Sequence, residues 1–204
     1  MEYLFSSEAL HALLKYIGKE EIFGISQNKQ IEKGLVELIR MELIDSAYKP
    51  KDKQLVFLNE MLRAYCEADI YIQFQDLSFG LKQSGLTIVL HGINVDEEEK
   101  YQVFSSNKET ILKSLLSNKV LLAHYQQMQD DKEKFYWEDT KLRLAIYDKN
   151  KEELIKIVLE IEGEKWYQLG EGWDRIEEVD PYNIIEKIIN VLPNEYKAII
   201  KGGA

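Results

Sequence analysis

The side chains that could do chemistry in this sequence are three histidines and one cysteine. His11, His91 and His124 lie far apart and have no spacing typical of a metal-binding motif. We expect His11 on the polar flank of a helix and His91 at the end of a strand, where a hydrogen-bonding turn is its ordinary role. Cys66 falls on the apolar face of a predicted helix, which favours a small buried side chain over a nucleophile. These residues predict neither a metal site nor nucleophilic catalysis.

Glycine motifs that bind phosphate are the next candidates. The sequence holds no nucleophile-elbow, P-loop or dinucleotide-binding pattern, and its cluster Gly170-Glu171-Gly172 carries an acid that would repel phosphate. The 36 Asp and Glu residues will include some close pairs by chance, so an enzyme with a carboxylate site stays open as an alternative. However, no acidic cluster lies in an apolar context that would raise its pKa. The sequence therefore predicts no cofactor and favours a protein without enzymatic activity.

Five aromatic residues on or beside predicted strands could contact a partner protein. They are Phe74, Phe79, Trp166, Tyr167 and Trp173. Aromatic side chains dominate both protein cores and binding hot spots, so core packing and partner binding are both open interpretations. We predict these five as the partner-binding residues.

Composition and charge limit the kinds of partner that the chain can bind. The chain of 204 residues has 26 Lys and Arg against 36 Asp and Glu, a net charge of −10, which argues against nucleic acids and anionic membranes as partners. Its 45% hydrophobic content is typical of a folded globular protein. The single cysteine cannot form an internal disulfide, and the first residues lack the pattern of a signal peptide. We therefore expect a soluble cytoplasmic protein.

The first third of the chain is predicted to be mostly helical. A short strand at Tyr3–Phe5 precedes an N-cap at Ser6 or Ser7 and a helix that ends near Gly18. Two further apolar stripes at helical spacing predict a helix from Ile31 to about Asp45, with Gly34 as a mild defect, and a helix from Pro50 to Cys66.

Apolar and polar residues then alternate, which is typical of strands. The predicted strands are Ile70–Phe74, Leu77–Leu81, Leu86–His91 and Tyr101–Phe104, with Asp96–Glu99 as a charged loop, and, after a connection at 117–137, Leu142–Ile146, Ile155–Ile161 and Trp166–Leu169. Ser106 and Glu109 form the capping box of one helix, and Asp180-Pro181 begins another that ends before Pro193. We expect residues 194–204 to form a loose tail.

The strand regions repeat along the chain. The segment at Ile70 corresponds to that at Leu142, Ile88–Leu90 to Ile157–Leu159, and the helix around Ile111 to that around Ile184, each about 70 residues apart. This predicts a single α+β domain over residues 1–204. Its antiparallel sheet would be built from two related strand-strand-strand-helix halves, about 1–118 and 138–193, with N-terminal helices.

Three stretches carry a family resemblance: Tyr3–Leu10, Leu38–Asp45, and Trp166–Leu169 followed by Asp180-Pro181. Their order resembles that of the EspG-like chaperones of ESX, or type VII, secretion systems, although Glu42 stands where the family commonly has Gly. The Lys-, Ile- and Tyr-rich, Arg-poor composition resembles that of a Firmicute relative. The resemblance implies an EspG-like fold and a non-enzymatic cytosolic chaperone or adaptor. Such a protein binds a helical secreted substrate on its sheet and the adjoining C-terminal helical region.

A second function class also fits the composition. Small acidic proteins with exposed sheets can neutralise basic toxins, so an immunity protein is the alternative hypothesis. An edge of the sheet would also allow a homodimer, which no feature of the sequence specifies.

Overall fold

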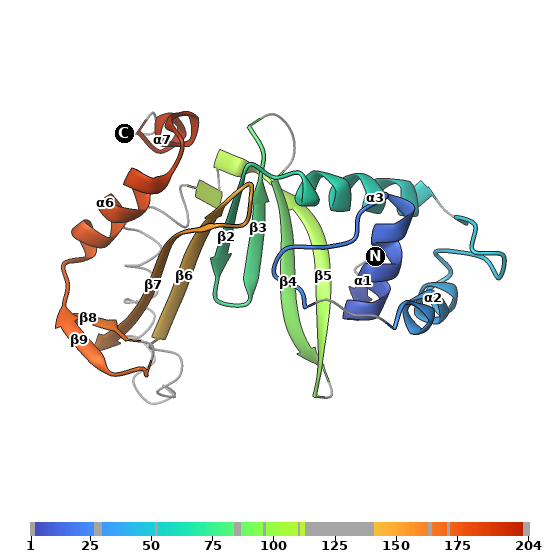
Figure 1. The fold of residues 1–204 in the computed structure, drawn as a ribbon, viewed down its shortest axis with the longest axis horizontal. Helices are drawn as coiled ribbons and strands as arrows, with labels where there is room; N and C mark the ends of the chain where they lie inside the picture. The colour runs from blue at the N-terminus through green and yellow to red at the C-terminus, as the bar shows by residue number, and fades with distance from the viewer. Residues whose placement is uncertain are drawn as a thin grey trace. The chain divides into compact units, whose positions relative to one another are not determined.

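The computed structural model describes residues 3–26, 30–51, 53–83, 87–95, 97–109, 111–112, 141–162, 165–170 and 172–201. The chain divides into two compact units (Figure 1). Unit 1 comprises Met1–Ser106 and Asp148–Lys151, and unit 2 comprises Asn107–Tyr147 and Glu152–Ala204. Both units combine helices with antiparallel strands, which confirms the predicted α+β class.

Unit 1 begins with the predicted strand and helix. Strand β1 (Leu4–Phe5) leads into α1 (Ser7–Tyr16), and the Ser6 hydroxyl accepts a hydrogen bond from the Ala9 N–H at 3.1 Å. This is the N-cap that the sequence predicts, because the hydroxyl satisfies an amide that has no partner in the first helical turn.

Gly34 lies where α1 meets α2 (Ile31–Arg40). A Cβ atom at residue 34 would lie 2.1 Å from the backbone oxygen of Glu8, which no relaxation of a side chain could relieve. The sequence interpretation of Gly34 as a mild helix defect is therefore wrong. The glycine is what lets the two helix backbones approach.

The next two helix boundaries also differ from the prediction. Helix α2 ends at Arg40, and Glu42 adopts a left-handed φ of 61°, so the chain turns before the predicted end near Asp45. Helix α3 spans Lys53–Cys66, and Pro50 lies before it in an isolated bridge with Ile44. Pro50 therefore does not begin a helix.

The strands of unit 1 follow in the order β1-β5-β4-β3-β2. Their bounds are β2 Ile70–Phe74, β3 Leu77–Leu81, β4 Thr87–Val95 and β5 Glu98–Ser106. Helix α3 packs against β3, β4 and β5. The ring of Tyr65 lies so close to Gly80 that a Cβ there would approach it to 2.7 Å. One face of this sheet is thus covered by the unit's own helices.

Strands β4 and β5 are longer than predicted. His91 pairs with Gln102 in the middle of the hairpin, and Glu98 and Glu99 pair with Val95 and Asn94. The predicted strand end at His91 is therefore wrong, and so is the predicted loop at Glu98 and Glu99. Glu97 lies in a turn, and Asp96 lies outside the described residues. Charged side chains at an exposed hairpin end are compatible with strand structure, so Glu98 and Glu99 belong to β5.

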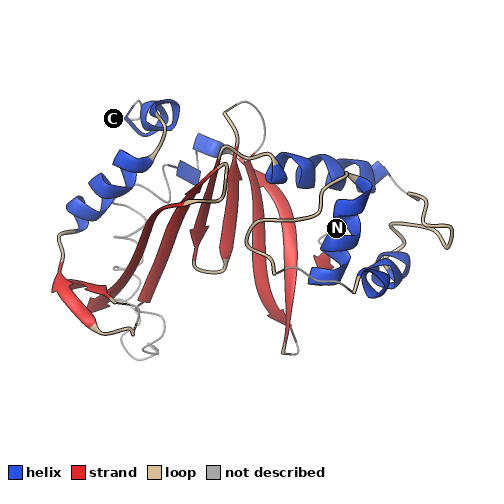
Figure 2. Cartoon of the chain, in the orientation of Figure 1, coloured by secondary structure: helices blue, strands red, loops and turns tan. Residues whose placement is uncertain are grey.

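Unit 2 carries the strand order β6-β7-β8-β9 and the helices α6 and α7 (Figure 2). The elements are β6 Lys141–Asp148, β7 Glu153–Glu162, β8 Lys165–Leu169, β9 Arg175–Glu178, α6 Pro181–Val191 and α7 Asn194–Lys201. Helix α6 packs against β7 and buries Ile184 and Ile188. Strand β9 was not predicted, and α7, with its fully buried Tyr196, replaces the predicted loose tail over 194–201.

The predicted correspondence between the halves agrees with the strand order for β2 and β6, which are the first strands of their meanders, but not for the second predicted pair. Ile88–Leu90 belong to the third strand after α3, whereas Ile157–Leu159 belong to the second strand of unit 2. The first-half helix also starts one residue late. The Ile111 N–H donates to the oxygen of Asn107, so Asn107 is the cap and Ser106 ends β5. The predicted connection at 117–137 lies outside the described residues.

Candidate functional site

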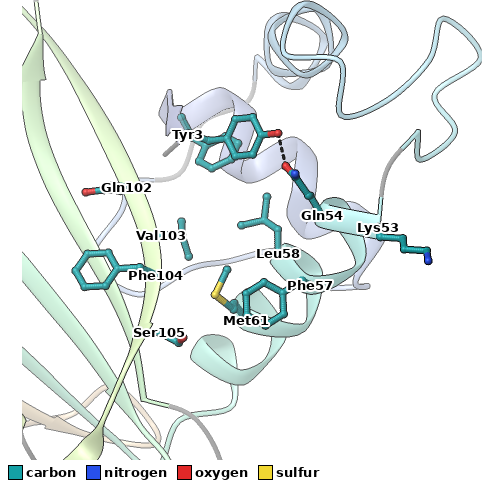
Figure 3. A pocket seen from close by; sticks show the side chains of 11 residues that line it. Tyr3, Lys53, Gln54, Phe57, Leu58, Met61, Gln102, Val103, Phe104 and Ser105 are labelled. Atoms are coloured by element: carbon teal, nitrogen blue, oxygen red, sulfur yellow. Dashed lines mark hydrogen bonds between the residues drawn. The ribbon is translucent and has the colours of Figure 1, made fainter. Parts of the chain in front are cut away.

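An apolar groove lies in unit 1 between α3, β5 and the first residues of the chain (Figure 3). It has a volume of about 700 Å³. Its lining residues are Tyr3, Phe5, Lys53, Gln54, Phe57, Leu58, Met61, Gln102, Val103, Phe104 and Ser105. They come from three segments that the antiparallel hairpin and the packing of α3 bring together.

The floor and the rim of the groove differ in exposure. Leu58 and Met61 are buried beside Val103, between the helix and the strand. Phe57 and Phe104 at the rim leave 50% and 38% of their surface exposed. Large apolar side chains that stay half exposed around an apolar floor are typical of a surface that another molecule covers.

One end of the groove is closed by a polar contact. The Tyr3 hydroxyl donates a hydrogen bond to the Gln54 Oε1 at 2.6 Å (Figure 3). The Tyr3 ring also lies 5.8 Å from that of Phe5, which is buried. This contact fixes the N-terminal segment against α3.

The outer edge of β5 is only partly paired beside the groove. Strand β1 covers Tyr101 and Gln102, which pair with Phe5 and Leu4. Within the described part of the chain, Val103–Ser106 have no strand neighbour on that side. A partner lying in the groove would therefore find open backbone N–H and C=O groups next to apolar side chains.

Two of the predicted partner-binding residues lie on the opposite face of the unit 1 sheet from Tyr71. Phe74 is half-buried opposite Leu77, and Phe79 is buried opposite Ile72. Neither residue lines the groove. In this conformation Phe79 is a core residue.

The other three predicted residues belong to unit 2. Trp166 is buried on one face of β8, and its neighbour Tyr167 is half-buried on the other, beneath the Arg175 guanidinium at 4.2 Å. Trp173 lies in the β8–β9 turn and is 38% exposed. The structure therefore places Tyr167 and Trp173 on the accessible side and assigns Trp166 to the core.

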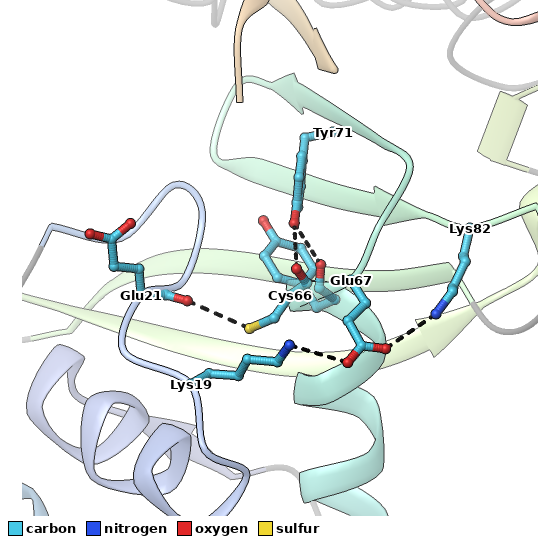
Figure 4. Close-up of polar contacts among 7 residues, drawn as sticks. Lys19, Glu21, Cys66, Glu67, Tyr71 and Lys82 are labelled. Carbon is cyan, nitrogen blue, oxygen red and sulfur yellow. Dashed lines mark hydrogen bonds and ion pairs between the residues drawn. The ribbon is translucent and has the colours of Figure 1, made fainter. Parts of the chain in front are cut away.

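Cys66 lies beside charged residues at the end of α3 (Figure 4). Its thiol contacts the backbone oxygen of Glu21 at 3.6 Å. Burial raises its pKa to about 11, although the nearby Lys19 opposes this. Glu67, the next residue, pairs with Lys19 at 3.2 Å and with Lys82 at 3.3 Å. A thiol that stays protonated at neutral pH is a poor nucleophile.

Two histidines are described. His11 is buried, not on a polar flank as predicted, and its Nδ1 lies 2.7 Å from the Ser7 oxygen. His91 lies 3.0 Å from an Asp76 carboxylate oxygen. His124 lies outside the described residues. Among the residues that the structure describes, no three His, Cys, Asp or Glu side chains gather as they would around a metal ion.

A second hollow, in unit 2, is acidic. It lies between β9 and α6, has a volume of about 380 Å³, and is lined by Glu177, Glu178, Val179, Asp180, Asn183, Ile184, Glu186, Lys187 and Asn190. Carboxylates outnumber the single lysine in this lining. Its chemistry suits a cationic partner.

The sequence did not predict the groove, because an apolar stripe at helical spacing identifies only the buried side of α3. Leu58 and Leu62 lie on that buried side, whereas Phe57 points away from it and is half exposed. The available signal was a pair of large apolar residues, Val56 and Phe57, outside the apolar stripe of a helix that already has a buried side.

Comparison with known proteins does not assign the chain to a family. No protein-family model matches it, and a search of curated proteins found no match. None of the described helices has both the length and the apolar character needed to cross a membrane.

Proposed function

We propose that this chain is a non-enzymatic, cytoplasmic chaperone or adaptor that binds a helical substrate of a type VII, ESX-like, secretion system. The observation that carries the proposal is the apolar groove of unit 1, with its half-exposed Phe57 and Phe104. An aggregation-prone apolar surface of this kind is normally covered, and a chaperone covers it with its client.

A helix fits the groove by its chemistry. An amphipathic helix inserts apolar side chains from one face, which can pack on Leu58 and Met61 while Phe57 and Phe104 close over its flanks. The polar face would then meet Lys53 and Gln54 at the rim. Apolar side chains of the client that reach the buried floor would contribute most of the affinity, and the rim aromatics would exclude water from them.

The EspG-like fold with two related halves is part of the same proposal. The support for it is that each unit builds an antiparallel meander, β2-β3-β4-β5 in one and β6-β7-β8-β9 in the other. In each case helical residues follow the last strand. The secretion assignment depends on this likeness and on the residues that carry the resemblance.

A pull-down from the native host, with the secretion system expressed, tests the function. Wild type should recover a small helical secreted protein at one-to-one stoichiometry, and Phe57→Asp should lose it. Val56→Asp is the matched control, because Val56 is equally exposed on α3 but does not line the groove. Equal recovery by wild type and Phe57→Asp would contradict the proposal.

The immunity function is the second candidate, and the acidic hollow between β9 and α6 favours it. A basic toxin would be recognised there by charge, and the net charge of −10 would speed the encounter. Rescue of cells from a toxin encoded by a neighbouring gene, lost on Asp180→Asn with Glu186→Gln, would support this function.

A second copy of the chain is another candidate occupant. The unpaired edge of β5 at Val103–Ser106 could pair with itself in a homodimer. Light scattering of the purified protein decides between a monomer, which keeps the edge free, and a dimer that Val103→Pro should dissociate.

A further inference from the structure

Two cations and an aromatic ring lie together on the face of the unit 2 strands that carries Lys141 and Arg143. None of these residues lines the groove of unit 1. Lys141 and Arg143 are alternate residues of β6, so they share one face. Both lie over the ring of Trp173, with the Lys141 Nζ at 4.9 Å and the Arg143 guanidinium carbon at 3.9 Å from its centroid. We call these three residues the Trp173 cluster.

The backbone of Trp173 is strained. Its φ is 64°, in the left-handed region, which a bulky side chain rarely adopts. The turn that holds it is tied by the Gly170 N–H to the Asp174 oxygen at 2.9 Å and by the Trp173 N–H to the Gly170 oxygen at 3.1 Å. Strain held by the surroundings is common at binding sites. Here it brings an aromatic ring from the β8–β9 turn over β6.

The carboxylates of Glu160, Glu162 and Glu178 on this face are each paired with a cation. Cross-strand pairing continues the face that carries Lys141 onto β7, β8 and β9. Lys141 pairs with Glu160, and Glu160 pairs with Tyr167. Arg175 pairs with Leu169, which lies on the same face of β8 as Tyr167. Arg175 binds the buried Glu160 and also Glu162, both at 2.7 Å. Both of these carboxylates are thus already paired with Arg175.

Arg143 remains available to an outside ligand. It is exposed, and within the described part of the chain it forms no ion pair. The Trp173 ring attracts the guanidinium but carries no net charge, so it orients the cation without neutralising it. A stacked guanidinium keeps its N–H edge directed outward, in the geometry that pairs with a carboxylate. Lys156, exposed and opposite Ala145 on the same face, adds a further positive charge.

We propose that the Trp173 cluster binds an acidic segment of a partner protein, with Arg143 pairing a carboxylate and the exposed part of Trp173 packing on the adjoining side chain. Charge complementarity argues for this occupant, because the cluster is a local excess of cations on a chain of net charge −10. The small extent of the cluster argues against a nucleic acid, because its backbone charges would continue beyond the cluster onto the acidic remainder of the chain. The proposal does not depend on the groove of unit 1.

The test measures the fluorescence anisotropy of a fluorescein-labelled peptide of alternating Glu and Leu, added to the full chain. Moderate salt, at about 0.1 M, screens charges more than about 10 Å away. Wild type should bind, and Arg143→Ala and Trp173→Ala should each weaken binding about tenfold or more. Arg63→Ala, which removes an exposed arginine of α3, is the charge-matched control and should bind as wild type does.

Two further measurements test the proposal even if Trp173→Ala disturbs the turn. Arg143→Lys retains the charge and loses the planar fork, so it should bind more weakly than wild type but more tightly than Arg143→Ala. A Lys and Leu peptide of equal length should not bind. Absence of binding, equal binding by Arg143→Ala and Arg63→Ala, or equally effective displacement by single-stranded DNA of the same charge would each overturn the proposal.

Discussion

Unit 1 and unit 2 each build an antiparallel meander but differ in the chemistry of their candidate sites. In unit 1 the candidate site is an apolar groove with half-exposed Phe57 and Phe104, although a separate hollow of this unit is lined by charged residues such as Glu32 and Arg40. In unit 2 the accessible features are charged, namely the Trp173 cluster and the acidic hollow beside Asp180. The meander therefore fixes where side chains lie, and the residue types at its exposed positions decide what each unit can bind.

The two units can be followed separately in solution. Trp166 and Trp173 lie in the described part of unit 2, so their fluorescence reports on the unfolding of that unit. Far-ultraviolet circular dichroism reports on both. A variant that unfolds one unit should therefore separate the two signals.

Gly34→Ala should have the largest effect. Its Cβ would lie 2.1 Å from the Glu8 oxygen, so α1 and α2 must move apart, and the free energy of unfolding of unit 1 should fall by about 3 kcal/mol. Urea denaturation followed by circular dichroism measures this loss. Gly92→Ala is the control and should cost far less, because its nearest contact would be the carboxylate oxygen of the flexible Glu99 side chain at 3.3 Å, and the Asp76 backbone oxygen would lie at an ordinary 3.6 Å. Equal losses for the two variants would contradict the close packing of α1 on α2.

Arg175→Ala should give the next largest effect, and in unit 2. It removes the partner of the buried Glu160 carboxylate and leaves that charge uncompensated. The tryptophan-monitored melting temperature should fall, and Glu160→Gln added to Arg175→Ala should restore part of it. An unchanged melting temperature for Arg175→Ala would show that this pair does not stabilise the sheet.

Alkaline pH should weaken unit 1. Burial raises the pKa of Tyr71 to about 12 and that of Cys66 to about 11, and it also raises the pKa values of Tyr65 and Tyr101. Because folding keeps these groups protonated, their contribution is fully present below their unfolded pKa values, about 8.5 for Cys and 10 for Tyr. It is then lost as pH rises toward the folded values. The tyrosinate absorbance of these buried tyrosines should appear above about pH 10, together with a loss of far-ultraviolet ellipticity that precedes any change in tryptophan fluorescence.

The raised pKa of Cys66 predicts that its thiol reacts slowly. The reaction of Cys66 with a disulfide reagent should be far slower at neutral pH than that of a free thiol, and its rate should keep rising until about pH 11. A rate that levels off near pH 8 would contradict the burial of this thiol.

Phe57→Ala should have the smallest effect on stability. Half of the side chain is already exposed, so unfolding free energy should change by about 1 kcal/mol or less. Denaturation in urea measures this. A large loss would assign Phe57 to the core of unit 1 and remove it from the groove rim.

The periodicity of the sequence predicted most of the strands and helices because burial of one face sets that pattern directly. It located β2, β6 and α1 closely. It missed β9, whose four residues are all exposed and so carry no apolar alternation. It also missed α7, because the eight residues around the buried Tyr196 are too short a stretch to show a helical period.

The candidate sites were harder to predict for a physical reason. A groove is formed by residues from separate segments, and the contact of Tyr3 with Gln54 across 51 positions has no trace in local spacing. Trp173 was identified as a possible anchor by its residue type alone. Its stacking on Lys141 and Arg143 depends on the strained turn, which the Gly170-Glu171-Gly172 pattern hints at but does not specify.

The most direct test of the central claim, that the unit 1 groove binds a helical client, is site-specific photocrosslinking in the native host. A benzophenone amino acid replaces Phe57 in one variant and Val56 in the other, two neighbouring and similarly exposed positions of α3. The account predicts that only the variant at position 57 crosslinks to a small helical secreted protein, at a single site on one of its helices. Equal crosslinking from both positions, or none from position 57 while the client is expressed, would contradict it.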